Sequence, residues 1–227
     1  MILATNIGFL RLDADGSVET IALVENENSL TRMNDGKCDP QGRFFAGTIA
    51  LELTEKAGTL YRLDADGTAS PVINGVTVSN GMGWSPDGGT FYYIDSFAYG
   101  IDAFDFDTDA GALSRKRRLI DVGRKDGLCD GMTVDREGGI WVALFGGWAV
   151  RRYRPDGSLD REIRLPVSQV TSCTFGGPDW RDLYITTASI TERGMLSEWD
   201  LKKQPHAGAI FAVRSEVQGL PTNFCAL

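Results

Sequence analysis

Alternating apolar and polar positions recur along this chain in four segments that share one plan. Each begins with a short turn-forming stretch and continues as a strand rich in aromatic and β-branched residues, which favour half-buried strands. The segments are residues 39–49, 85–96, 135–145 and 176–188. The first three are each followed by a further hairpin-like strand, at residues 58–67, 100–111 and 148–157. No long stretch shows a helical period behind a capping residue. The pattern therefore predicts many short strands and few, short helices.

The four segments recur at a nearly constant interval. Between the second turn positions, Pro40, Pro86, Arg136 and Pro178, the intervals are 46, 50 and 42 residues. A four-stranded β-propeller blade takes about 40 to 45 residues. We therefore expect an all-β propeller, with blades that pack against one another through the aromatic residues Phe44, Phe45, Trp84, Tyr92, Trp141 and Tyr184.

Small polar residues stand five positions before the start of each turn. They are Asn34, Asn80, Asp130 and Ser172. The innermost strand of a propeller blade begins beside the central channel, so equivalent positions should face one another there. Oxygen ligands from Asn and Asp suit a hard divalent cation, and an Asp at this place can also act as a base.

The same residues have a second interpretation. Asn-Gly and Asp-Gly are common turn pairs, and the chain contains seven Asp-Gly pairs. Asn80 and Gly81 would then only end a loop before the hairpin that Asp87 and Gly88 close. The shared spacing across the blades favours the ring of polar residues over this alternative.

Composition and charge restrict the function. The 227 residues carry a formal net charge of -8 and no extended basic stripe, which argues against a nucleic-acid partner. The one histidine, His206, follows a proline in a turn-like stretch and is interpreted as an exposed loop residue. The four cysteines have no CxxC spacing, which indicates free buried thiols in a reducing cytosol instead of a zinc site.

Targeting signals are also missing from the pattern. The N-terminal stretch lacks the basic start and long apolar run of a signal peptide, and no stretch approaches 18 consecutive apolar residues. We therefore expect a cytoplasmic protein with no membrane partner.

Five stretches of the chain together resemble the successive blade signatures of one known family. They are "RMNDGKCDPQGRFFAGTI", "VSNGMGWSPDGGTFYYIDS", "DGLCDGMTVDREGGIWVALFGGWAVRRYRPDG", "LPVSQVTSCTFGGPDWRDLYITTA" and "QPHAGAIFAV", in this order. On these stretches the chain resembles the SMP-30/gluconolactonase/regucalcin-like family of sugar lactonases. The resemblance covers nearly the whole chain. It implies a six-bladed β-propeller that holds one divalent cation (Ca²⁺, Zn²⁺, Mn²⁺ or Mg²⁺) and hydrolyses a small sugar lactone.

The resemblance also implies roles for particular residues. Asn80 matches a metal ligand, and Asp130 matches a residue that is both a metal ligand and the acid/base of the reaction. Arg32, Asn34 and Glu52 match the family's substrate-binding residues. Without the blade signatures, Arg32 and Glu52 would be interpreted as surface charges on loops.

The chain departs from the family pattern at its start. The family begins with a blade carrying an E-x-P-V-W type signature, whose Glu completes the metal site, and no such stretch occurs here. The opening "MILATNIGFLRLDADGSVE" resembles the outer strands of the second blade. We expect residues 1–227 to form a single propeller domain of about four to five blades, truncated at the N-terminus. The first blade and the inner strand of the second would be missing.

Three functions stay open at this point. The leading hypothesis is metal-dependent hydrolysis of an aldonolactone by a monomer or weak dimer. The alternatives are a calcium-binding protein without turnover, and an inactive propeller fragment that lacks the metal-binding Glu. A site with one carboxylate fewer should bind its cation more weakly.

Overall fold

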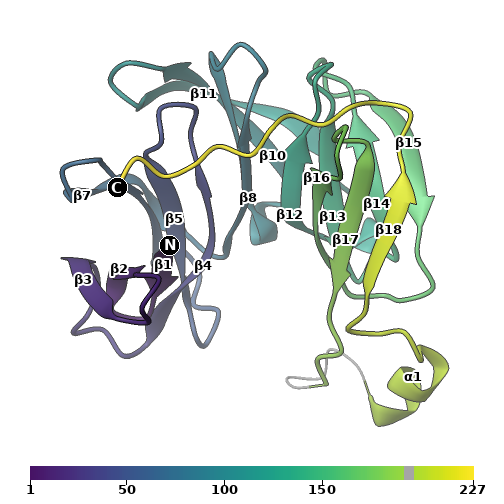
Figure 1. Ribbon diagram of the computed structural model, residues 1–227. Coiled ribbons are helices and arrows are strands. Elements are labelled where there is room, and N and C mark those ends of the chain that lie inside the picture. The colour runs from purple at the N-terminus through teal and green to yellow at the C-terminus, as the bar shows by residue number, and fades with distance from the viewer. Residues whose placement is uncertain (192–196) are drawn as a thin grey trace.

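The computed structural model describes residues 1–191 and 197–227, which form five antiparallel β-sheets (Figure 1). The first and last sheets have three strands and the other three have four. The sheets are β1 (Ile2–Thr5), β2 (Gly8–Leu12) and β3 (Val18–Leu23); β4 (Thr31–Cys38), β5 (Phe44–Ala50), β6 (Gly58–Leu63) and β7 (Ala69–Val76); β8 (Ser79–Trp84), β9 (Thr90–Asp95), β10 (Gly100–Asp107) and β11 (Ala112–Asp121); β12 (Leu128–Val134), β13 (Ile140–Phe145), β14 (Ala149–Tyr153) and β15 (Leu159–Arg164); β16 (Val170–Gly176), β17 (Asp182–Thr187) and β18 (Ile210–Arg214).

Helical elements are few and short, as the sequence predicts. The structure contains two 3₁₀ turns and one α-helix in its described part: η1 (Ser96–Ala98), η2 (Arg124–Asp126) and α1 (Glu198–Lys203). No helix among the described residues is long and apolar enough to cross a membrane. His206 lies exposed in a turn after α1, as expected.

Four strands form the inner layer of the molecule. β4, β8 and β12 are the first strands of the four-stranded sheets, and β16 is the first strand of the last sheet. β8 contacts β4 and β12, and β12 contacts β16, so these strands follow one another around the channel. The first and last sheets stand at the two ends of this arc (Figure 1). The first sheet consists of β1, β2 and β3, and its strand β1 contacts β4. Within the described chain, β4 is therefore the first strand of the inner layer.

The hydrophobic core consists of separate layers between neighbouring sheets. Between the second and third sheets, Phe45 packs edge-on against Trp84 with ring centroids 5.3 Å apart. Between the fourth and last sheets, Trp141 packs against Phe175 at 5.7 Å. Tyr92 belongs to the cluster between the third and fourth sheets, and Phe44 meets Phe9 of the first sheet. Blade-to-blade packing is therefore confirmed for the predicted aromatic residues Phe44, Phe45, Trp84, Tyr92 and Trp141.

Tyr184 is the exception, and its predicted burial is wrong. It is 40% exposed, whereas its neighbours Leu183 and Ile185 in β17 are buried. Successive side chains of a strand point to opposite faces. Leu183 and Ile185 use the face that packs on the fourth sheet, so Tyr184 points to the outer face of the last sheet.

The turn that leaves an inner strand is held by a buried carboxylate. After β12, Asp135 is fully buried and accepts hydrogen bonds from the N–H groups of Glu137 and Gly139. Its second oxygen accepts from Trp141 Nε1 and Arg152 Nε, both at 2.7 Å. A buried charge is tolerated when it is paired and hydrogen-bonded in this way. The far end of β12 is therefore rigidly joined to β13 and β14.

Glycines let neighbouring inner strands approach closely at the other end. A Cβ on Gly81 of β8 would lie 2.6 Å from the Asp130 carbonyl oxygen, and one on Gly131 of β12 would lie 2.2 Å from Ser172 Oγ and 2.9 Å from its Cα. Neither glycine has a positive φ. Asn80 and Gly81 are therefore part of a strand and not a turn, and Gly81 is required for close packing.

Gly131→Ala should lower the free energy of unfolding by about 1–3 kcal/mol, because the added methyl group forces backbone shifts between β12 and β16. Gly89→Ala is the matched control, since its Cβ would meet only the Asp87 side chain, at 3.7 Å or more. Urea denaturation of both variants measures the difference. Equal losses for the two variants would contradict the importance of the close approach.

Candidate functional site

The predicted polar residues lie at irregularities of the inner strands. In β8, Ser79 pairs with Asp95 and Met82 pairs with Tyr93, so Asn80 and Gly81 together oppose one residue of β9. β12 has the same irregularity at Asp130 and Gly131, and β4 has it at Asn34 and Asp35. Such bulges bend a strand and re-aim its side chains, and they are frequent beside active sites. The predicted register across the blades thus corresponds to a repeated structural feature.

A network around Asp95 holds the start of β8. The Asp95 carboxylate accepts hydrogen bonds from the N–H groups of Thr77 and Val78, at 2.9 and 3.0 Å. It also caps η1 by accepting from the Phe97 N–H, which places Ser96 in the first position of η1. A carboxylate at a helix start satisfies donors that have no partner within the helix. Asp95 therefore positions both the strand that carries Asn80 and the residue that Asn80 contacts.

Asn80 is linked through Ser96 to the next inner strand. Asn80 is buried, and its Nδ2 donates to Ser96 Oγ at 3.0 Å. Ser96 Oγ in turn donates to the carbonyl oxygen of Cys129 at 2.6 Å, next to Asp130. The Asn80 side chain also lies near the Asp130 carboxyl group, because it opposes the rise in the pKa of Asp130. Because the amide nitrogen is directed to these partners, the amide oxygen is the atom of Asn80 that could serve as a ligand.

Asp130 lies in an environment that disfavours its charge. Burial raises the pKa of Asp130 to about 7, and the negative charge of Asp35 adds to the rise. Hydrogen bonds from the Asn80 side chain and the Gly131 N–H oppose it. A carboxyl group with a pKa near neutrality can act as a general base under ordinary conditions.

Asp35 and Lys37 of β4 reach toward β12, across the inner layer. Lys37 Nζ donates to the carbonyl oxygen of Met132 at 2.7 Å. Burial raises the pKa of Asp35, and the positive charge of Lys37 opposes this rise. Burial lowers the pKa of Lys37. Asp35, Lys37 and Ser96 are not among the residues that the repeat pattern predicts. Aligning "MNDGK" with "SNGMG" would have placed Asp35 at the second bulge position, where the other two strands have Gly.

The predicted substrate-binding residues lie at the same end of the inner strands. Arg32 and Asn34 are exposed on β4, and Arg32 Nη1 donates to Asn34 Oδ1 at 3.1 Å. Asn34 Nδ2 donates to the Ser79 carbonyl oxygen at 2.8 Å, beside Asn80. Glu52 is exposed in the turn after β5, where Leu51 N donates to the Leu30 carbonyl oxygen at 2.8 Å. Glu52 is thus on the turn beside the start of β4.

Ser172 of β16 occupies a different environment from the other three. Its side chain lies against Gly131, so its role at this position is packing. The extra residue of β16 is Thr171, which pairs with Thr186 through their hydroxyl groups at 2.8 Å. The site therefore extends over β4, β8 and β12.

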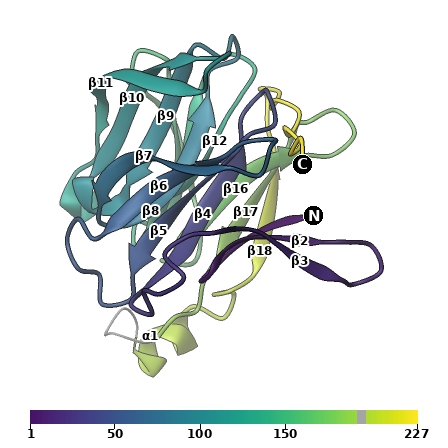
Figure 2. The same ribbon diagram turned by 90° about the vertical axis from the view of Figure 1, so that its left-hand side faces the viewer.

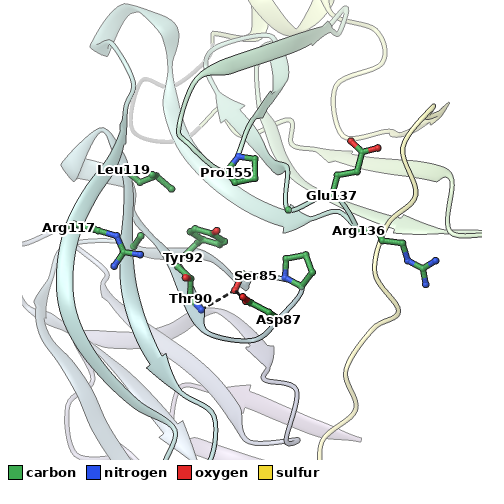
Figure 3. Close-up of a pocket in the computed structure, with 12 residues that line it drawn as sticks. Ser85, Asp87, Thr90, Tyr92, Arg117, Leu119, Arg136, Glu137 and Pro155 are labelled. Atoms are coloured by element: carbon green, nitrogen blue, oxygen red, sulfur yellow. Dashed lines mark hydrogen bonds between the residues drawn. The ribbon is translucent and has the colours of Figure 1, made fainter.

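One cavity lies away from Asn80 and Asp130. A cavity of about 480 Å³ lies between the third and fourth sheets, where Arg117 and Tyr92 face Pro155 and Glu137 (Figure 3). It belongs to the outer groove between two blades.

The oxygen atoms at the site are of the type that coordinates a divalent cation. The Asn80 amide oxygen and the Asp130 carboxylate are hard oxygen ligands. Within residues 1–191 and 197–227, no three side chains of the His, Cys, Asp or Glu type come together as a metal site. Two protein oxygens are fewer than Ca²⁺ takes, so water or another group would have to supply the rest.

Known proteins match nearly the whole chain. Residues 1–189 match the family description SMP-30/Gluconolactonase/LRE-like region. Regucalcin from Gallus gallus is 42% identical over 211 residues, which are 90% of this chain and 69% of that protein. Regucalcin from Homo sapiens is 40% identical over 203 residues, covering 87% of this chain and 67% of that protein.

Solved structures confirm the predicted all-β propeller. The calcium-binding protein regucalcin from Agrobacterium tumefaciens superposes with a TM-score of 0.93 at 29% identity, covering 100% of this chain and 76% of that one. A luciferin-regenerating enzyme gives a TM-score of 0.89 at 30% identity and 77% coverage of its chain, again with all of this chain covered. A gluconolactonase from Xanthomonas campestris gives 0.66 at 26% identity, with 82% and 64% covered. On the family match and the identity to the regucalcins, this chain belongs to the SMP-30/gluconolactonase/LRE family.

Proposed function

We propose that this protein is a divalent-metal-dependent hydrolase of small sugar lactones of the aldonolactone class. The observation that carries the proposal is the position of Asn80 and Asp130 at equivalent bulges of the neighbouring strands β8 and β12, with Arg32 and Asn34 at the same end of the inner layer. Membership of a family whose described members include a gluconolactonase supports it.

The residues divide into those that bind the sugar and one that moves a proton. A divalent cation held by the Asn80 amide oxygen and the Asp130 carboxylate would polarise the lactone carbonyl. Asp130 accepts a proton from the attacking water as its oxygen bonds to the carbonyl carbon. The ring C–O bond then breaks, and the ring oxygen takes the proton from Asp130, which gives the open-chain hydroxy acid. The Arg32 guanidinium has further N–H donors for sugar oxygens, and Asn34 and Glu52 supply polar partners for hydroxyl groups.

A calcium-binding function without turnover is the second candidate. Oxygen donors at the site and the similarity to a protein described as calcium-binding favour it. Titration of the purified chain with aldono-1,4- and aldono-1,5-lactones in the presence of Ca²⁺, Zn²⁺, Mn²⁺ or Mg²⁺ distinguishes the candidates. Metal-stimulated acid release supports the lactonase, and metal binding without acid release supports the second candidate. The absence of both metal binding and acid release would indicate an inactive propeller fragment.

Asp130→Asn should lower turnover by about 10² to 10⁴-fold at saturating metal, because it removes the base. It should also weaken metal binding, since it removes the ligand's charge. Acid release and calorimetric titration measure the two effects. Ser172→Ala is the control one strand further on, and it should leave most activity because Ser172 only packs on Gly131. Near-normal turnover of Asp130→Asn would show that Asp130 is not the base.

Asp130→Asn should also make stability less dependent on pH in the presence of a chelator. The pKa of Asp130 is about 7 in the folded chain against 3.8 in the reference state, so the folded state holds the extra proton between these values. The wild-type protein therefore loses stability as the pH rises from about 4 to 7, and the variant escapes this loss. We expect the variant's advantage to grow by about 1–3 kcal/mol between pH 4.5 and pH 8, as measured by urea denaturation.

The control for this experiment is Asp156→Asn in an exposed turn. Hydrogen bonds from the Ser158 hydroxyl and N–H lower the pKa of Asp156, which is the opposite shift. Its replacement should give no advantage that grows with pH. The prediction for Asp130 is wrong if its variant differs from the wild type equally at both pH values.

A further inference from the structure

The C-terminal segment, residues 217–227, runs back from the last sheet over the turns of the other sheets (Figures 1 and 2). Arg136 N donates to the Gln218 carbonyl oxygen at 2.8 Å, and Gly219 N donates to the Trp180 carbonyl oxygen at 2.7 Å. Further on, Ala226 N donates to the Gly42 carbonyl oxygen at 2.9 Å. The segment thus connects the end of the arc to the turn between β4 and β5.

The same segment closes one end of the inner channel. A cavity of about 320 Å³ is lined by Lys37, Thr133 and Thr174 from three inner strands and by residues 220–223 of the segment. This is the end opposite to Asn80 and Asp130, because Lys37, Thr133 and Thr174 come later in their strands. The position of the segment therefore determines how open this end of the channel is.

Two cysteine side chains meet where the segment reaches β4. Cys38 is the last residue of β4, and Cys225 lies two residues after Asn223, whose Nδ2 donates to the Cys38 carbonyl oxygen at 3.1 Å. Both cysteines are partly exposed and line one cavity of about 310 Å³ next to Phe44 and Leu227. The two thiols are thus near each other, at the wall of one cavity. The Asn223 side chain and the Ala226 backbone N–H, on either side of Cys225, attach the segment to the end of β4 and the turn that follows it.

We propose that Cys38 and Cys225 form a reversible thiol–disulfide pair that locks the C-terminal segment onto the β4–β5 turn. The other two cysteines do not compete, since Cys129 is 0% and Cys173 is 3% exposed. Neither Cys38 nor Cys225 is among the residues proposed to act on the lactone, so this pair is independent of that function.

The oxidant would be a small-molecule disulfide. Burial raises the pKa of Cys38 to about 12, and the adjacent Cys225 thiol adds to the rise, so Cys38 is a poor first nucleophile. Cys225 therefore loses its proton and attacks one sulfur of the small disulfide, which forms a mixed disulfide and releases one small thiol. Cys38 then loses its proton and attacks the Cys225 sulfur, which releases the second small thiol. Two protein thiols are oxidised and one external disulfide is reduced to two thiols.

The cross-link would join distant parts of the chain. Asn223, which comes two residues before Cys225, is 185 positions away from Cys38 in the sequence. A disulfide that closes a long loop restricts the unfolded chain more than one that closes a short loop. The link would also keep the segment over the Lys37 end of the channel, where only non-covalent contacts hold it in the reduced protein.

Treatment of the reduced full-length chain with oxidised glutathione tests the proposal. Trypsin then releases "CDPQGR" (38–43) joined to "SEVQGLPTNFCAL" (215–227), and the intact monomer is lighter by two hydrogen atoms. The oxidised protein should melt about 5–15 °C higher than the reduced one. Dithiothreitol should reverse both changes.

Cys225→Ser is the control variant, with the thiol replaced by a hydroxyl group of similar size. It should form no linked peptide, and its melting temperature should not respond to the oxidant as the wild type does. Unlinked thiols after oxidation, a stable glutathione adduct without the link, a link between another pair, or a covalent dimer would each overturn the proposal.

Discussion

The close approach of neighbouring inner strands is the constraint on which the candidate site depends. A side chain larger than hydrogen at Gly81 would collide with the backbone of β12 at Asp130 and Met132, and one at Gly131 would collide with Ser172 of β16. The second residue of each bulge in β8 and β12 therefore serves packing, while the first faces its polar neighbours. This division of roles places Asn80 and Asp130 within hydrogen-bonding reach of each other.

The two ends of an inner strand have different physical characters. At the far end of β12, Asp135 has four hydrogen-bond donors, one of which is the buried, positively charged Arg152, so its charge is fully satisfied. At the near end, Asp130 shares a desolvated region with a second carboxylate. A well-satisfied network makes a scaffold rigid, whereas an unfavourable charge is typical of a functional site. The strand thus carries a strained site on a firmly held support.

The sequence predicted the parts of this arrangement that repeat. The interval between turns predicted the blades, and the residues five positions before each turn gave Asn34, Asn80 and Asp130 at equivalent bulges. It did not predict Ser96 or Lys37, because their contacts connect elements that the repeat does not relate. Asp35 was missed because Gly stands at its bulge position in β8 and β12. Lys37 reaches Met132, 95 positions away, and skips the strand between them. The pattern alone also could not show that Tyr184 points away from the packed layers. Alternation divides the side chains of a strand between two faces, but it does not say which face is covered.

The charges around Asp130 bear on the proposed cation site. Asp35 on β4 raises the pKa of Asp130, while the ammonium group of Lys37 donates to the Met132 carbonyl oxygen. Two carboxyl groups in one desolvated region cannot both ionise easily without a positive charge. In the metal-free chain a proton on Asp130 reduces this repulsion up to about neutral pH. A divalent cation would replace that proton, so metal binding and proton release should be coupled at this residue. Such an arrangement would lower the stability of the metal-free fold and would favour the proposed occupied site, a relation expected where residues are kept for function and not for folding.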